Sequence, residues 1–178
     1  MIRYLYPTKI KEVENVINAD GLFHKKDLQI GLNEPDIVKF QPNSAIVLDF
    51  GKEIRGGVRI LTYETQDIKC VRIRIRFGES LSECFAELGE KNATNDHSPR
   101  DIEADLSAWS DLCFGDTGFR FVRIDSLSDG WFCVKSIVAK SYELNKQPIY
   151  SYDGNDKLVS AIFDAAKRTI DLLSLIHI

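Results

Sequence analysis

The sequence is poor in the residues and patterns that mark several functional classes. It has only four cysteines in 178 residues, and no two of them form a CxxC pair. The spacing of a zinc site is therefore absent, and scattered thiols of this kind favour the reduced state and a cytoplasmic protein. Neither a signal peptide nor an apolar run of ~18 residues that could span a membrane is present. The cysteines are Cys70, Cys84, Cys113 and Cys133.

A large excess of charge of either sign is also absent. Lys and Arg total 23 and Asp and Glu total 27, which gives a net charge of -4 at pH 7. This balance provides no electrostatic reason to bind nucleic acid or an anionic membrane surface. Internal repeats and low-complexity tracts are absent too. We expect one domain, or one domain with the start of a second, able to bury about 70% of its unfolded surface.

Alternation of apolar and polar residues dominates the middle of the chain. In 71–77, odd-numbered positions are apolar and even-numbered positions are arginine, so one face of a strand would be core and the other would not. Turn residues separate such segments, which predicts a mainly β fold, a jelly-roll-like antiparallel β-sandwich over 28–148. The predicted strands are 45–50, 58–63, 69–77, 102–106, 119–124 and 131–142.

The N-terminal region lacks a clear period. Residues 10–18 have some helical spacing, which Asp20-Gly21 ends, and 28–32 is a candidate first strand. We therefore predict an irregular segment over 1–27.

A helical period begins after Tyr152. The turn Asp153-Gly154-Asn155-Asp156 supplies a helix N-cap, and two adjoining lines of apolar residues follow over 153–172. A stripe this broad is wider than a helix on the surface of a small domain needs, so we expect it to pack on other helices, as the first helix of a truncated all-α domain. Residues 173–178 match the translation of a transposase adapter used in sequencing libraries, and we interpret them as a non-native tail.

Polar and charged residues concentrate between the strands that end at Phe77 and begin at Ile102. Carboxylates beside a histidine suit acid/base chemistry or cation binding, whereas loop scaffolding or a domain contact, with Arg100 paired to a carboxylate, is the interpretation that we favour. Glu79 follows a strand without a marked carboxylate partner, so we expect a loop anchor or domain contact there as well. These candidate residues are Glu79, Asn92, Thr94, Asn95, Asp96, His97, Arg100 and Asp101.

Four short motifs occur in a fixed order between 45 and 125. They are Leu48-Asp49-Phe50-Gly51-Lys52-Glu53 with Gly56-Gly57, then Gly78-Glu79-Ser80-Leu81, then Ala93-Thr94-Asn95-Asp96-His97 with Arg100-Asp101, and last Thr117-Gly118-Phe119-Arg120-Phe121-Val122-Arg123-Ile124. In this order they resemble the β-sandwich domain that precedes the catalytic barrel in bacterial α-L-rhamnosidases of glycoside hydrolase family 78.

The resemblance implies a parent glycosidase that hydrolyses terminal α-L-rhamnosides with inversion in an (α/α)6 barrel. No position of this chain matches the catalytic motifs of the family, so the resemblance implies a non-catalytic accessory domain that needs no cofactor or metal. Its partners would be the missing C-terminal barrel and, through it, a rhamnoside. Two other interpretations stay open: a stand-alone carbohydrate-binding or lectin-like module, and a structural β domain of another multidomain enzyme.

Overall fold

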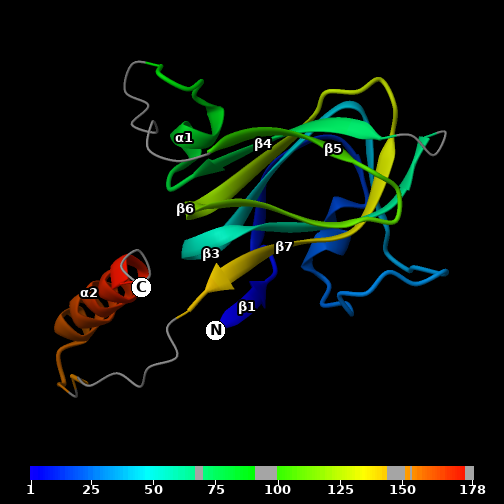
Figure 1. Ribbon diagram of the computed structural model, residues 1–178. Coiled ribbons are helices and arrows are strands. Elements are labelled where there is room, and N and C mark those ends of the chain that lie inside the picture. Colours follow the sequence, from blue (N-terminus) through cyan, green and yellow to red (C-terminus); the bar gives the residue numbers. More distant parts are fainter. Residues whose placement is uncertain (67–69, 91–99, 144–150, 153, 175–178) are drawn as a thin grey trace.

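The computed structural model describes residues 1–66, 70–90, 100–143, 151–152 and 154–174 (Figure 1). The fold is mainly β, as predicted, and its strands are antiparallel. The elements in chain order are β1 (Ile2–Leu5), β2 (Lys9–Ile17), the 3-10 helix η1 (Ala19–Phe23), β3 (Val38–Thr65), β4 (Val71–Gly78), α1 (Leu81–Phe85), β5 (Asp101–Leu106), β6 (Asp111–Ser126), β7 (Phe132–Tyr142) and α2 (Lys157–Ser174).

Two long strands, β3 and β6, organise the sandwich. They pair along most of their length, and the strand order is β1-β7-β3-β6-β4-β5 with β2 added to β3. Residues 39–49 of β3 lie beside β2, whereas β7 pairs with both ends of β3, at 38–40 and 56–65. Figure 1 shows the strands curving around a common interior. The predicted strands 45–50 and 58–63 are therefore parts of one bent strand.

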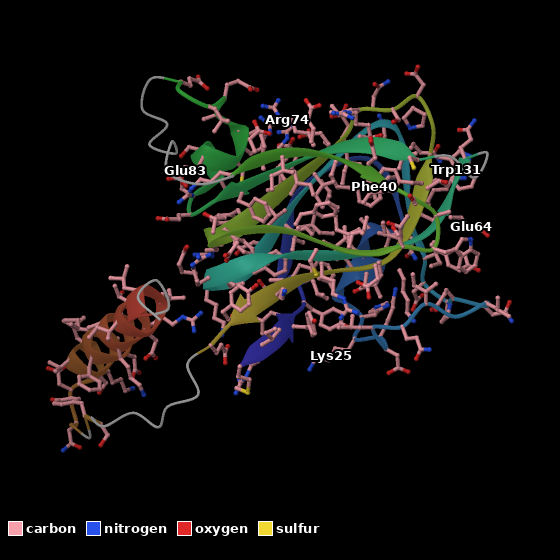
Figure 2. All side chains as sticks on the ribbon, in the orientation of Figure 1. Lys25, Phe40, Glu64, Arg74, Glu83 and Trp131 are labelled. Atoms are coloured by element: carbon pink, nitrogen blue, oxygen red, sulfur yellow. The ribbon has the colours of Figure 1, made fainter. Side chains whose placement is uncertain are left out.

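The core lies between the strands and follows the predicted alternation. Ile73 and Ile75 of β4 are fully buried, and Phe40 stacks on Phe132 with ring centroids 4.6 Å apart. Figure 2 shows Phe40 inside the sandwich and Arg74 on its outer side. Because each large apolar side chain contributes about 1.5–3 kcal/mol when it is buried, this core accounts for a fold without disulfides.

The N-terminal region differs from the prediction. Residues 1–27 are not irregular: they form β1, β2 and η1, whereas 28–32 contains no strand. Most of β2 is exposed, and its pairing with β3 shifts register twice. An exposed edge strand is held by backbone hydrogen bonds, which do not require alternating apolar side chains. The sequence pattern therefore carried no signal for it.

The cysteines are all free thiols; Cys84 and Cys133 are buried, while Cys70 and Cys113 are exposed. Among the described residues, no cluster of His, Cys, Asp or Glu has the arrangement of a metal site. Within the same part of the chain, neither helix combines the length and the apolar character needed to cross a bilayer.

Helix α2 begins where the N-cap signal placed it. The Asp156 carboxylate accepts hydrogen bonds from the backbone N–H groups of Leu158 at 2.8 Å and Val159 at 3.3 Å, which satisfies free donors of the first turn. Figure 1 shows α2 beyond one end of the sandwich rather than across its face. As a result Leu158, Ile162 and Ile170 are 69%, 59% and 64% exposed.

Candidate functional site

The site is built on a bulge in β3. Asp49 pairs with Phe121 and Ile54 with Phe119, so residues 50–53 lie opposite Arg120 alone. The buried Asp49 carboxylate holds the bulge, because it accepts hydrogen bonds from the Gly51 N–H at 2.7 Å and from Arg120 Nε at 2.9 Å. Gly51 has a φ of 80°, a conformation that glycine adopts readily. The extra residues carry Glu53 out to the end of the sandwich.

Glu79 reaches the same point from the other side of β6. Strand β4 pairs with β6 up to Gly78, and Glu79 follows directly. At Gly118, a β-carbon would lie 3.3 Å from Glu53 Oε1 and 3.5 Å from Glu79 Oε1. The two carboxylates therefore approach one another across Gly118, which has no side chain to separate them.

Arg100 holds Glu79 in place. Its guanidinium donates to Glu79 Oε1 at 2.9 Å and to Glu83 Oε2 at 3.2 Å, and its carbonyl accepts from the Phe77 N–H at 2.8 Å. Glu83 Oε2 also accepts from the Glu79 N–H at 2.8 Å. Glu83 lies on α1, at the same end of the view as α2 in Figure 2. The Arg100 side chain is only 13% exposed, so this group is held on several sides.

Helix α2 closes one side of a pocket of about 480 Å³. The guanidinium of Arg168 donates to the backbone carbonyl of Glu53, while its buried Nε has no hydrogen-bond partner among the described residues. We call this cavity the Glu53 pocket. It is defined by Glu53, Glu79, Arg100, Gly118, Arg168 and Leu172.

Glu53 is the most perturbed acid of the site. Partial burial, and then the nearby Glu79 carboxylate, raise its pKa to about 7, although Arg100 opposes the shift. Within the described part of the chain, no hydrogen-bond donor contacts the Glu53 carboxylate. Near neutral pH this group can therefore either donate or accept a hydrogen bond.

The structure unites only some of the candidate residues. Glu79 and Arg100 lie together, and the expected pairing of Arg100 with a carboxylate is present. Asp101 is separate: it begins β5 and accepts from Arg74 Nε at 2.8 Å. The remaining candidates, Asn92, Thr94, Asn95, Asp96 and His97, lie outside the described residues.

Sequence reasoning missed Glu53 as a functional candidate. It stands in the first of the four motifs, where Gly51 and the residues after it break the alternation of the strand. An interrupted strand next to a glycine is a bulge signal, but it does not reveal which side chain meets the bulged residue.

No protein-family model matches the chain, and no curated protein matches it. Solved structures share its fold. A rhamnosidase from Klebsiella oxytoca with rhamnose bound aligns with a TM-score of 0.66 and 13% identity over 97% of this chain and 35% of that chain. The GH78 family rhamnosidase of Bacillus sp. GL1 aligns with a TM-score of 0.54 and 12% identity over 87% of this chain and 15% of that one. At such identities the likeness shows the fold alone.

Proposed function

We propose that this chain is the non-catalytic accessory β-sandwich of a glycoside hydrolase that resembles α-L-rhamnosidases, together with the first helix of its helical catalytic domain. The observation that carries the proposal is the extent of the likeness to the Klebsiella oxytoca rhamnosidase, which covers 97% of this chain. An alignment of that extent takes in α2 as well as the strands. This chain spans only 35% of that enzyme, so the activity of a whole enzyme is part of the proposal.

The exposed apolar side of α2 supports a helical neighbour. Leu158, Ile162 and Ile170 present apolar surface to solvent, and burying each of them would contribute about 1.5–3 kcal/mol. The sandwich does not cover these residues because α2 lies beyond its end (Figure 1). Further helices packed on this side would bury them, as in other helical domains.

We assign the Glu53 and Glu79 pair no role in bond cleavage. Hydrolysis of a glycosidic bond uses one carboxyl group as acid and a second as base or nucleophile. Glu79 Oε1 accepts from Arg100 at 2.9 Å, so this carboxylate is engaged in an ion pair rather than free to act as base or nucleophile. A catalytic pair in the helical domain is the better account.

The proposal is tested with an aryl α-L-rhamnoside. The 178-residue chain should give no turnover above a blank, whereas the longer polypeptide encoded by the source gene should hydrolyse the substrate with inversion, seen by NMR of the first sugar product. An inactive longer polypeptide, or one without a helical domain after α2, would contradict the proposal. Turnover by the 178-residue chain that disappears in Glu53→Gln but persists in Glu64→Gln would place catalysis in the sandwich.

A further inference from the structure

The bulge in β3 also borders a second cavity, which has a volume of about 610 Å³. This volume lies within the range of roughly 300–1,000 Å³ that is usual for small-molecule sites. Residues 4–8 line one part of the cavity, and residues 50–52 of the bulge line another. We call this cavity the Lys52 pocket. It is defined by Tyr4, Tyr6, Phe23, Lys25, Phe50 and Lys52.

We propose that the Lys52 pocket binds a small aromatic carboxylate. The proposal goes beyond the accessory role and does not depend on it, because it rests on the side chains of this pocket alone. Two features carry it: the aromatic character of the apolar lining, and a positive charge that no acidic lining residue cancels.

Aromatic rings make up most of the apolar lining. Tyr4, Tyr6 and Phe23 are contributed by the N-terminal region, and Phe50 by the bulge. Aromatic rings prefer to meet another ring in an offset-stacked or edge-to-face arrangement. A ligand with a flat aromatic body can therefore contact several of these rings at once.

Two of the rings are held in place before a ligand arrives. The Tyr6 hydroxyl accepts a hydrogen bond from the Lys26 backbone N–H at 3.0 Å and donates to the Lys26 carbonyl at 2.7 Å. The buried Phe50 packs edge-on against Phe119, with ring centroids 5.9 Å apart. Such preorganisation lowers the entropic cost of binding.

The charged groups of the pocket are both positive. Lys25 and Lys52 are exposed, and neither ammonium group has an ion-pair or hydrogen-bond partner in the described part of the chain. Figure 2 shows Lys25 on the same side of the sandwich as β1. None of the described residues that line the pocket is acidic. A carboxylate can accept charge-assisted hydrogen bonds from such ammonium groups.

The Asp49 carboxylate, which holds the bulge, does not cancel this positive charge. It is almost fully buried and pairs with Arg120 at 2.9 Å and with Lys11 at 3.6 Å. Because two other cations already balance Asp49, the charges of Lys25 and Lys52 remain available to a ligand. Charge complementarity therefore favours an anion over a neutral or cationic molecule with the same ring.

The experiment is an NMR titration of the ¹⁵N-labelled chain with four probes. They are 4-hydroxyphenylacetate, its amide 4-hydroxyphenylacetamide, the amine tyramine, and acetate. The first three share one ring and differ in charge, whereas acetate has the charge without the ring. We expect saturable shifts at the amides of Lys25, Gly51 and Lys52 with 4-hydroxyphenylacetate, and binding about fivefold or more weaker with each of the other probes.

Substitution of the two lysines tests the charge directly. Lys25→Gln and Lys52→Gln should each weaken binding of 4-hydroxyphenylacetate about two- to fivefold, and the double variant about tenfold. Lys157→Gln is the matched control, since it removes the same charge from an exposed position of α2 that does not line the pocket. It should leave binding unaltered, and thermal melts should show all four variants folded.

Three results would overturn the proposal. The first is the absence of saturable shifts with 4-hydroxyphenylacetate, or shifts confined to amides outside the Lys52 pocket. The second is binding of the amide or of tyramine that is as tight as binding of the carboxylate. The third is binding that the double lysine variant leaves intact. The titration does not involve rhamnoside hydrolysis, so failure of this proposal and failure of the proposed function are distinguishable.

Discussion

Replacing Glu53 with glutamine should stabilise the protein at alkaline pH and leave its stability unchanged in acid. The pKa of Glu53 is about 7 in the folded chain against an ordinary value of 4.5. The folded state therefore binds more protons than the unfolded state between these values, and this group lowers stability as pH rises from about 4.5 to about 7. Below pH 4.5 Glu53 is neutral in both states, so glutamine changes little there.

The size of the effect follows from the same values. The span from 4.5 to about 7 corresponds to about 3 kcal/mol if the whole shift is expressed as stability. Glu53 is only half-buried, and solvent screens a partly exposed charge, so we expect about 1–2 kcal/mol at pH 8. Part of this gain should vanish when Glu79→Gln is already present, because the Glu79 carboxylate is the second cause of the shift after burial.

Urea unfolding followed by tryptophan fluorescence at pH 4.5 and pH 8 measures this difference. Comparing wild type and variant at each pH cancels the titration of all other groups. Glu64→Gln serves as the control, since Glu64 is exposed and Figure 2 places it far from α2. A Glu53→Gln chain that is no more stable than wild type at pH 8, or equally stabilised at both pH values, would refute the raised pKa and its assignment to burial.

Three further outcomes are expected. Asp101→Ala should lower the free energy of unfolding by about 1–2 kcal/mol through loss of its bonds to Arg74, and an unchanged urea midpoint would contradict this. Lys135→Met should cost about 1–3 kcal/mol because it removes the ion-pair partner of the nearly buried Glu34 carboxylate, which then keeps only its hydrogen bond from the Gly31 N–H. The double variant with Glu34→Leu should recover part of this loss in thermal melts. Replacing the exposed Leu158, Ile162 and Ile170 of α2 with serine should reduce self-association in size-exclusion chromatography. A wild-type chain that is monomeric, and whose α2 amides resist hydrogen exchange as strongly as those of the strands, would contradict a helical neighbour.

The sequence alone determined the class of fold and most of the central strands. Alternation in 71–77 predicted the buried Ile73 and Ile75 and the more exposed Arg72 and Arg74, because a pleated strand presents successive side chains to opposite faces, although Arg76 is buried. The capping signal before α2 was equally local, since Asp156 bonds to the next turn of its own helix. Local physics of this kind can be read from neighbouring residues.

Only the tertiary structure decided the edge strand and the Glu53 pocket. Strand β2 is formed by backbone pairing with a partner far along the chain, which leaves no pattern in its own side chains. Glu53, Gly118 and Glu79 meet because a bulge in β3, the middle of β6 and the end of β4 converge. The pKa of Glu53 then depends on burial and on a carboxylate from another strand. Such long-range register and proximity are properties of the packed sheet, so no local pattern could supply them.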